Sequence, residues 1–366
     1  MDVSSISIIG LGLIGGSLAK AFRHEYKNLK IYAVDNCTES LRLAEREGVL
    51  DKGFTNCCEE IWNSDVIFIC TPVSKTIEYV NELSHKLKKG SILTDVASTK
   101  GDLFTYIDGL DNPPLFVGGH PMAGTEKSGY QNSFAHMFEN AYYVLTPTKG
   151  SSEEVIKTLK ELLRGIGAIP IVVSSWEHDT VTGCISHVPH IIASALVTLA
   201  KNTENSQGLV KLLAAGGFKD ITRIASSNPS MWKDVVISNG PVIVKLLEDY
   251  KHIVDDMINN INSGKNDEIH SFFDNAKTFR DGFSNIATGL LPKNFELIVD
   301  VTDEPGIIGR IATLLGNSGI NIKNINVSNS REYEQGCLRI TLSDQTNTDK
   351  AFEILKESSY MVFRKD

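Results

Sequence analysis

Residues 118–129 read GGHPMAGTEKSG, and the one histidine among them, His120, could accept or donate a proton near neutral pH. Four glycines and a proline make this stretch poor material for a helix or a strand, so we expect a loop after the apolar run 115–117. Ser98 follows another apolar run, 92–96, and its hydroxyl could orient a group bound to the imidazole. The structural alternative is a histidine that only caps a loop.

A glycine pattern near the N-terminus indicates which chemistry the histidine could serve. Gly10, Gly12 and Gly15 have the spacing G-x-G-x-x-G, between the apolar run 6–9 and apolar residues at helical spacing. Such glycines turn the chain, let the backbone approach a pyrophosphate and let the helix pack on the strand. Asp35 ends a second predicted strand, where a carboxylate would bind the adenosine ribose and repel a 2′-phosphate. An ordinary turn aspartate would leave the glycines unexplained, so the pattern favours NAD over NADP.

Apolar runs alternate with amphipathic helical stretches through the first half of the chain, which predicts an α/β, Rossmann-type doubly wound parallel sheet. The runs are 6–9, 30–34, 66–70, 92–96, 115–117, 142–145 and 169–173. Ligands bind outside the carboxyl ends of such strands, which selects the loops 71–73, 97–100 and 118–129. With NAD in that crevice, His120 could take the proton of a substrate hydroxyl while the carbon that bears this hydroxyl loses a hydride to NAD. The expected cofactor-binding residues are Gly10, Gly12, Leu13, Ile14, Gly15, Asp35, Thr71 and Pro72.

From residue 174 the pattern changes to long helical runs, the first with a serine cap at 174 or 175. His187 and His190 would share one helix face, and Pro189 between them should kink the helix. Two histidines are too few ligands for a metal, so we expect no metal and interpret them as core or substrate-contacting residues. Arg223 lies in an apolar patch, as either a buried ion pair or a fork for a substrate carboxylate.

The helices expected at 241–262 and 266–282 are amphipathic and too few to bury their apolar faces in one copy, which predicts a homodimer. After a linker at 291–294, the order βαββαβ predicts a separate α+β module with no nucleophile–base pair. We therefore expect a cofactor domain at 1–173, an all-α domain for substrate and dimerisation at 174–290, and a regulatory domain at 292–366.

Composition narrows the possible partners. The formal net charge of −9 and the absence of a basic tract argue against nucleic acid and anionic membranes. We expect no apolar stretch of the roughly 18 residues that span a bilayer, hence a cytoplasmic protein. The six cysteines form no C-x-x-C pair, and we interpret them as reduced core thiols.

Taken together, several motifs resemble the prephenate dehydrogenase family of tyrosine biosynthesis, followed by an ACT domain, over essentially the full length. They are GLGLIGGSLA, DVASTK, GGHPMAGTEKSG, SHVPH, GGFKDITRIASSNPSMW and DEPGIIGRIATLLGNSGINI. The resemblance implies oxidative decarboxylation of prephenate to 4-hydroxyphenylpyruvate, with reduction of NAD to NADH. It also implies feedback inhibition by tyrosine bound to the ACT domain.

The resemblance also implies residue roles. His120 would be the catalytic histidine, bonded to the ring hydroxyl of prephenate, and Ser98 would orient both groups. The implied substrate-binding residues are Arg223 for a carboxylate, His190 and Trp232 in the pocket, and Glu126, His178 and Asp179 in an ionic network near its entrance. For Glu126 and Lys127 a solvated ion pair is the alternative. The candidate tyrosine contacts are Asp303, Gly306 and Asn321.

Three alternatives stay open at this point. Arogenate differs from prephenate only in an amino group in place of the side-chain keto group, and none of the residues named distinguishes them. Another NAD-dependent hydroxy-acid dehydrogenase could share the same domain order, because a Rossmann domain serves many substrates. A redox-inactive regulator that senses NAD and an amino acid is the third, and the presence of Ser98, His120 and Arg223 argues against it.

Overall fold

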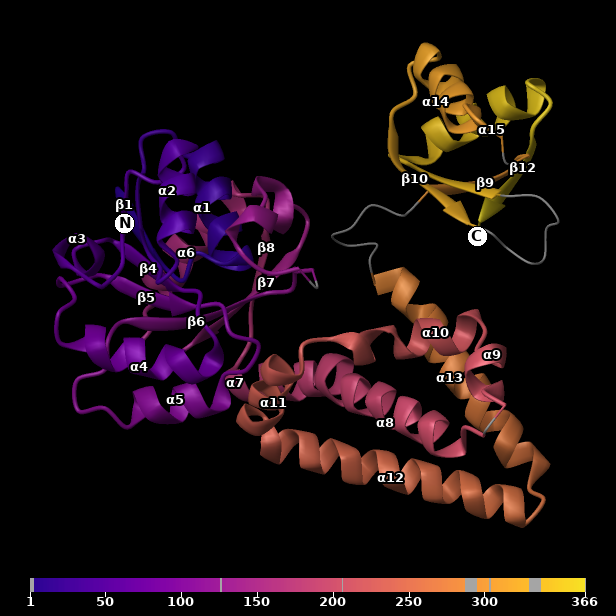
Figure 1. The fold of residues 1–366 in the computed structure, drawn as a ribbon, viewed down its shortest axis with the longest axis horizontal. Coiled ribbons are helices and arrows are strands. Elements are labelled where there is room, and N and C mark those ends of the chain that lie inside the picture. The colour runs from indigo at the N-terminus through magenta and orange to yellow at the C-terminus, as the bar shows by residue number, and fades with distance from the viewer. Residues whose placement is uncertain are drawn as a thin grey trace. The chain divides into compact units, whose positions relative to one another are not determined.

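The computed structural model describes residues 3–125, 127–205, 207–286, 295–302, 304–328 and 337–365. The chain divides into two compact units, Met1–Asp256 and Met257–Asp366. The first unit holds an eight-stranded sheet and the helices as far as residue 256, within the helix Gly240–Asn262. The second unit holds a four-stranded sheet (Figure 1).

The large sheet has the strand order β3-β2-β1-β4-β5-β6-β7-β8, which contains the Rossmann order 3-2-1-4-5-6. Successive strands are added on one side of β1 up to β3 and on its other side from β4 onward. The crevice for a dinucleotide is therefore expected at the carboxyl ends of β1 and β4. The strands are β1 (Ser5–Ile9), β2 (Lys30–Val34), β3 (Lys52–Phe54), β4 (Val66–Ile69), β5 (Ile92–Asp95), β6 (Phe116–Pro121), β7 (Tyr142–Pro147) and β8 (Ile169–Val172).

Helices cover both faces of this sheet, and each face has its own apolar core. Side chains of α1, α2 and α6 belong to one buried cluster, and side chains of α4 and α5 belong to the other. The doubly wound α/β prediction is therefore confirmed. The helices are α1 (Leu13–Glu25), α2 (Thr38–Arg46), α3 (Glu59–Trp62), α4 (Val73–Ser84), α5 (Gly101–Asp108) and α6 (Glu153–Gly165).

The sheet is mostly rather than entirely parallel. β6 and β7 pair antiparallel, whereas every other pair in this sheet is parallel. Between β6 and β7 the described residues form two short 3₁₀ turns, Tyr130–Asn132 and Ala135–Phe138, and no α-helix. An antiparallel neighbour needs no crossover helix, and therefore the all-parallel prediction was wrong at this one pair. The short edge strand β3 was also not predicted.

The stretch 118–129 is a strand, not a loop, in its first four residues. β6 extends to Pro121, and His120 pairs with Val144 of β7. A Cβ at Gly118 would lie 2.2 Å from Thr146 Oγ1, and one at Gly119 would lie 2.5 Å from the Asp95 carbonyl oxygen. The loop prediction was wrong for 118–121, because these two glycines serve close packing of a strand rather than a turn, and it holds for the described residues of 122–129.

The helical region begins where the sequence predicted, with Ser174 capping α7 through a complete capping box with Glu177. A single π-helical turn, Gly183–His187, joins α7 to α8 and lets the chain pass Pro189. Asn228 caps α11, with Pro229 at its first turn. The helices are α7 (Ser175–Thr182), α8 (Val188–Thr203), α9 (Leu209–Leu213), α10 (Gly216–Thr222), α11 (Pro229–Ser238) and α12 (Gly240–Asn262).

The helix formed by 175–203 corrects a second expectation, because it is long and apolar enough to cross a membrane by length and composition. Only 22% of its most apolar window is buried inside the protein. Ile185, Leu199, Ile221 and Ile237 are exposed large apolar side chains of this helical region. The expectation missed this stretch because its apolar residues are interrupted by histidines and serines.

The second unit contains the end of α12, the helix α13 (Asn266–Ile286) and the C-terminal module. In the module, α14 and α15 pack against an antiparallel sheet with the order β10-β11-β9-β12, which confirms the predicted βαββαβ arrangement. Its elements are β9 (Phe295–Asp300), α14 (Ile307–Asn317), β10 (Ile322–Ser328), β11 (Cys337–Leu342), α15 (Gln345–Glu357) and β12 (Met361–Lys365).

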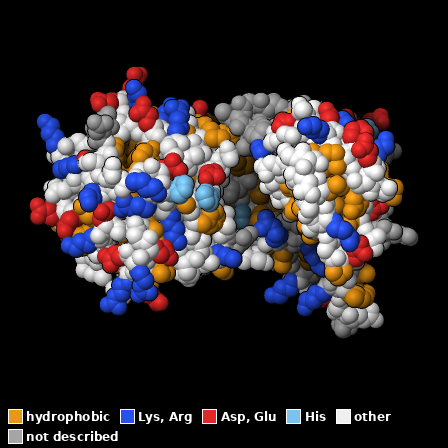
Figure 2. All heavy atoms as spheres, turned by 90° about the horizontal axis from the view of Figure 1, so that it is seen from above, with side chains coloured by type: hydrophobic (Ala, Val, Ile, Leu, Met, Phe, Trp, Pro, Cys, Tyr) orange, Lys and Arg blue, Asp and Glu red, His pale blue; other side chains and the backbone are white. Residues whose placement is uncertain are grey.

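Two surface properties bear on partners. Lys and Arg side chains are interspersed with Asp and Glu on the face shown in Figure 2, as the composition suggested. The five cysteines for which the structure describes the side chain are free thiols, but Cys37 and Cys184 are exposed. The interpretation of the cysteines as core thiols was therefore wrong for these two, because each lies on a helix end or turn that faces solvent.

Candidate active site

The glycine turn between β1 and α1 has the shape that a pyrophosphate requires. Gly10 has a φ of +95°, and a Cβ there would lie 2.6 Å from the Cys70 carbonyl oxygen. No atom lies within 4 Å of a Cβ built on Gly12, so the backbone is open to a ligand there. α1 begins at Leu13 with no side-chain cap and no acidic residue in its first turn, which leaves its first N–H groups for an anion.

Asp35 lies beside this turn, at the end of β2. Its Oδ2 accepts a hydrogen bond of 2.5 Å from the Leu11 N–H, and its Oδ1 accepts one of 2.7 Å from the Cys37 N–H. Thr71 also contacts the turn, and its hydroxyl is buried with no partner among the described residues. Pro72 caps α4. The open glycine, the fixed carboxylate and the orphan hydroxyl together fit an adenine dinucleotide.

His120 lies at the carboxyl end of β6 and is the first member of a chain of hydrogen bonds. Its Nδ1 is 2.8 Å from His178 Nε2, and His178 Nδ1 is 2.7 Å from Asp179 Oδ1. Because the carboxylate can only accept, His178 donates from Nδ1 and, when both rings are neutral, accepts at Nε2. His120 then carries its proton on Nδ1, so its Nε2 lone pair is free to accept a proton from a ligand.

The surroundings keep this imidazole neutral. Burial, the nearby Lys100 ammonium, His178 and His187 hold the pKa of His120 well below its usual 6.5. His178 and Asp179 are themselves buried, with 2% and 4% of their surface exposed. In the structure these two residues bond to the Nδ1 side of His120, and their place at a pocket entrance stays a prediction.

Asp179 also fastens two parts of the chain together. Its carboxylate accepts hydrogen bonds from the backbone N–H groups of Lys100 and Gly101, at the start of α5. No side chain of α5 itself caps this helix, so Asp179 supplies the cap from α7. Asn239 adds a further link, since its amide donates to the Asp179 carbonyl and to His187 Nδ1.

Lys100 and Asp95 form a fully buried ion pair next to His120, and neither was predicted as a site residue. Lys100 Nζ lies 2.7 Å from Asp95 Oδ2, and both side chains are 0% exposed. Burial lowers the pKa of Lys100, against the attraction of Asp95. A sequence signal for this pair does exist. The acid ends an apolar strand, and the lysine follows five residues later in the loop 97–100, where ligands are expected because it follows the carboxyl end of a parallel strand.

Ser98 lies in the same loop after β5 and is partly buried. Within the part of the chain that the structure describes, no hydrogen bond joins it to His120. The next residue, Thr99, bonds through its hydroxyl to Ser238 of α11 at 2.9 Å, which ties the loop to the helical region. Glu126 lies outside the described residues. Lys127 is exposed, and its backbone N–H donates to the Thr125 hydroxyl.

The predicted substrate residues of the helical region cluster around one indole. The His190 ring stacks on Trp232 with 3.6 Å between centroids, and the His187 ring meets the same indole edge-on. Burial lowers the pKa of His190, and the charge of Arg223 lowers it further, although a bond to the Ser186 carbonyl opposes this. Because that carbonyl accepts from His190 Nδ1, the Nε2 of a neutral His190 is an acceptor. Trp232 Nε1 is buried with no partner among the described residues.

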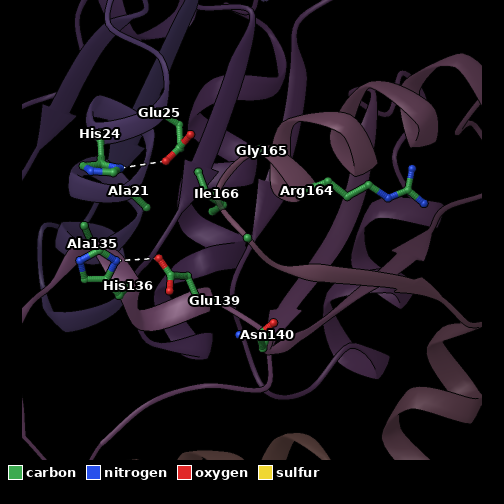
Figure 3. A pocket seen from close by; sticks show the side chains of 11 residues that line it. Ala21, His24, Glu25, Ala135, His136, Glu139, Asn140, Arg164, Gly165 and Ile166 are labelled. Atoms are coloured by element: carbon green, nitrogen blue, oxygen red, sulfur yellow. Dashed lines mark hydrogen bonds and ion pairs between the residues drawn. The ribbon is translucent and has the colours of Figure 1, made fainter. Parts of the chain in front are cut away.

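Two cavities on the large-sheet domain lie away from these residues. One, of about 290 Å³, opens beside the C-terminal end of α1, where His24 bonds to Glu25 and His136 to Glu139 (Figure 3). The other, of about 540 Å³, is lined by residues near β1, α1 and α6. Neither contains a predicted site residue. The described residues contain no group of three or more histidines, cysteines or acids placed to hold a metal ion.

Comparison with protein-family models gives three matches. The model described as prephenate dehydrogenase, nucleotide-binding domain, matches residues 18–172. The model described as prephenate dehydrogenase, dimerization domain, matches residues 174–275. The ACT domain model matches residues 295–358.

Individual relatives cover nearly the whole chain. Prephenate dehydrogenase of Bacillus subtilis is 36% identical over 99% of this chain and 98% of its own length. Prephenate dehydrogenase of Lactococcus lactis is 35% identical over 98% of this chain and 99% of its own length.

Among solved structures, prephenate dehydrogenase from Aquifex aeolicus, in complex with hydroxyphenyl propionate and NAD+, matches with a TM-score of 0.71 and 32% identity. The match covers 77% of this chain and 99% of that one. Synechocystis arogenate dehydrogenase matches with a TM-score of 0.68 and 29% identity, over 76% of this chain and 99% of that one.

Proposed function

Because this chain belongs to the prephenate dehydrogenase family, we propose that it converts prephenate and NAD to 4-hydroxyphenylpyruvate, carbon dioxide and NADH, in tyrosine biosynthesis. The observation that carries this proposal is the position of His120. A neutral imidazole with a free Nε2 lies at the carboxyl edge of the sheet whose glycine turn fits a dinucleotide.

NAD supplies the acceptor for the hydride that leaves the ring carbon. The open backbone at Gly12 and the N–H groups of Leu13, Ile14 and Gly15 would hold its pyrophosphate, and Asp35 would bind the adenosine ribose. Thr71 and Pro72 would line the same crevice from β4, with the orphan Thr71 hydroxyl as a donor.

His120 would accept the proton of the ring hydroxyl at Nε2 as the carbon–hydrogen bond breaks. Decarboxylation then makes the ring aromatic and leaves a phenolate oxygen, to which the imidazolium returns the proton. The proton balance of the reaction is therefore closed within the site. His178 and Asp179 would stabilise the imidazolium in the interval, since the carboxylate lies at the far end of the hydrogen-bond chain.

The remaining predicted residues would bind and orient the substrate. Arg223 would hold a substrate carboxylate, and its charge already acts on His190. His190 and Trp232 would form the pocket wall, since their stacked rings leave an imidazole acceptor and an indole donor for a polar ligand. Ser98 would orient the ring hydroxyl against His120. Glu126, proposed at the entrance, lies outside the described residues.

The test is a side-by-side assay of NADH formation at 340 nm, with prephenate and arogenate each offered with NAD and with NADP. We expect turnover with prephenate and NAD, and much less with NADP because Asp35 repels a 2′-phosphate. Faster turnover of arogenate would assign the chain to that substrate. Absence of turnover with all four pairs would refute the dehydrogenase proposal.

We further propose that the ACT domain binds L-tyrosine and inhibits the enzyme. Gly306, in the left-handed conformation just before α14, and Asn321, exposed before β10, are the candidate contacts that the structure describes. Asp303, the third candidate, lies outside the described residues. A truncated chain that ends at residue 291 should keep dehydrogenase activity and lose inhibition by tyrosine, as followed in the same assay.

The proposed domain division is 1–173, 174–290 and 292–366, which the three matched family models support. We also propose a homodimer, because the middle model is described as a dimerization domain and the helical region exposes large apolar side chains. Such an interface would cover the apolar helix of 175–203 with protein, in keeping with a cytoplasmic enzyme. Light scattering of the purified chain tests the dimer.

A further inference from the structure

Building on the roles proposed above for Ser98 and His120, we infer that Lys100 and Asp95 form a positioning clamp for these two residues. The pair binds the backbone of Ala97 and of Gly119, the residues directly before Ser98 and His120. It thereby sets the spacing and direction of the two side chains that would meet the substrate hydroxyl.

Lys100 supplies one half of the clamp. Its Nζ donates three hydrogen bonds of 2.7 Å each, to the carbonyl oxygens of Ala97 and Gly119 and to Asp95 Oδ2. An ammonium has three donors, so each one is used and none is left for solvent. The aliphatic stem fits because β6 has no side chain at Gly118, where a Cβ would lie 2.9 Å from Lys100 Cδ.

Asp95 supplies the other half. Its Oδ2 accepts a hydrogen bond of 3.0 Å from the Ala97 N–H, and its Oδ1 accepts one of 3.0 Å from the Gly119 N–H. Each of the two backbone residues is therefore held at both its N–H and its C=O by one ion pair. Such a grip fixes the orientation of the peptide units from which Ser98 and His120 project.

A purely structural role is the alternative to be excluded. Buried ion pairs contribute little stability compared with apolar residues of the same volume, so stability alone gives no reason for one here. Another Lys–Asp pair of this domain, Lys88 with Asp65, lies at the opposite, amino-terminal edge of the sheet and is partly exposed. It offers a matched control for the loss of a Lys–Asp bond without a catalytic neighbour.

The first experiment compares Lys100→Met with Lys88→Met in the full-length protein. We expect Lys100→Met to lower kcat by on the order of 10²-fold, because a misplacement of about 1 Å at reacting groups has an effect of that size. The KM for NAD should stay within about twofold, since the glycine turn does not contact Lys100. Lys88→Met should lower the melting temperature but leave kcat unchanged.

Because Lys100→Met leaves the Asp95 carboxylate unpaired and could prevent folding, a second variant removes both charges. Asp95→Asn with Lys100→Met should fold more stably than the single variant and still show a low kcat, since the two carbonyls have lost their donor. A folded double variant with kcat within about twofold of wild type would overturn the clamp.

The third readout needs no substrate and separates this inference from the proposed reaction. The charged and titratable groups around His120 are Lys100, His178, His187, Asp95 and Asp179. Loss of the Lys100 ammonium should raise the pKa of the His120 ring, followed by NMR of histidine labelled with ¹⁵N and assigned with His120→Asn. The same spectra report the ring tautomer, which the bond to His178 sets. A tautomer and ring chemical shifts that are unchanged in a folded Lys100→Met protein contradict the clamp, whereas an inactive wild-type protein contradicts only the reaction.

Discussion

The carboxyl edge of the eight-stranded sheet and the four-stranded C-terminal sheet bury different kinds of side chain. At the first edge, Asp95, Lys100, His178 and Asp179 are all less than 5% exposed, and each has hydrogen-bond partners. In the described part of 295–365, Thr348 is the only buried polar side chain. The other buried side chains of that core are aliphatic.

This difference separates the proposed catalytic region from a scaffold. Buried charges are costly unless they are paired, so a fold keeps them where they position or tune reacting groups. An aliphatic core excludes water and holds a module together, without chemistry of its own. Substitutions in the polar network of the first sheet should therefore lower kcat. Substitutions in the core of the second sheet should lower only the stability of its module.

The change with the largest expected effect removes the proton acceptor. His120→Asn should lower kcat by about 10²–10⁴-fold, the usual contribution of one acid–base group, and leave the affinity for NAD nearly unchanged. Steady-state NADH formation and a separate NAD titration measure the two quantities. His136→Asn, which changes an exposed histidine bonded to Glu139, is the control. Turnover near the wild-type rate would mean that the polar edge is not the catalytic one.

The next variant acts one step behind the imidazole. Asp179→Asn weakens the acceptor that fixes the His178 tautomer and the cap at the start of α5. We expect kcat to fall by about 10- to 10²-fold through lost orientation, with a loss of roughly 1 kcal/mol in the free energy of unfolding. Kinetics and urea unfolding measure these effects. A loss of stability with kcat intact would assign Asp179 to scaffolding alone.

Arg223→Ala should instead act on binding. A charged hydrogen bond contributes about 1.5–3 kcal/mol, so its loss should raise the KM for prephenate by about 10- to 10²-fold. The kcat should change little, because the ground and transition states carry similar carboxylates. Lys219→Ala, on the neighbouring helix α10, is a matched control for the loss of one positive charge. If Arg223→Ala lowered kcat as much as it lowered kcat/KM, Arg223 would contribute to the transition state rather than to substrate binding alone.

The pH profile should show a smaller effect. The pKa of His120 lies well below 6.5, so the imidazole stays neutral and kcat/KM should vary by less than about twofold between pH 6.5 and 8. Activity should be lost only at lower pH, as the ring takes up a proton.

Thermal melts over the same range provide the control for this profile. Burial lowers the pKa of His187 to about 4, so between pH 6.5 and 4 the unfolded chain binds a proton that the folded chain does not. The free energy of unfolding therefore decreases as the pH is lowered from 6.5 to 4. An acid limb of kcat/KM centred above pH 6.5, in a protein that is still folded, would contradict a buried neutral base.

The smallest catalytic effect is expected in the second sheet. Leu338 is 1% exposed in its core, so Leu338→Ala should lower the stability of the C-terminal module by about 2–5 kcal/mol. The kcat without tyrosine should remain within about twofold of wild type. Calorimetry and the NADH assay measure the two. A decrease in kcat as large as that expected for Asp179→Asn would contradict the proposal that the core of the second sheet affects only stability.

Much of the fold could be predicted from local patterns. The βα alternation, the Ser174 helix start and the C-terminal βαββαβ order depend on residues close in sequence, and each is confirmed. The β6–β7 pairing was missed because strand direction depends on how the connection 122–141 folds. The strand at Gly118–Pro121 was missed because its glycines match the side chains Thr146 and Lys100 of distant segments.

The candidate site divides in the same way. The sequence by itself determined the glycine turn, the carboxylate at Asp35 and the presence of His120 at a strand end, since spacing along one βαβ unit dictates these positions. Only the tertiary structure decided that His178 supports His120 across 58 residues, and that Asp179 caps a helix 79 residues before it. The physical reason is that a hydrogen bond requires contact within about 3 Å, and contacts between distant segments arise only when the layers pack.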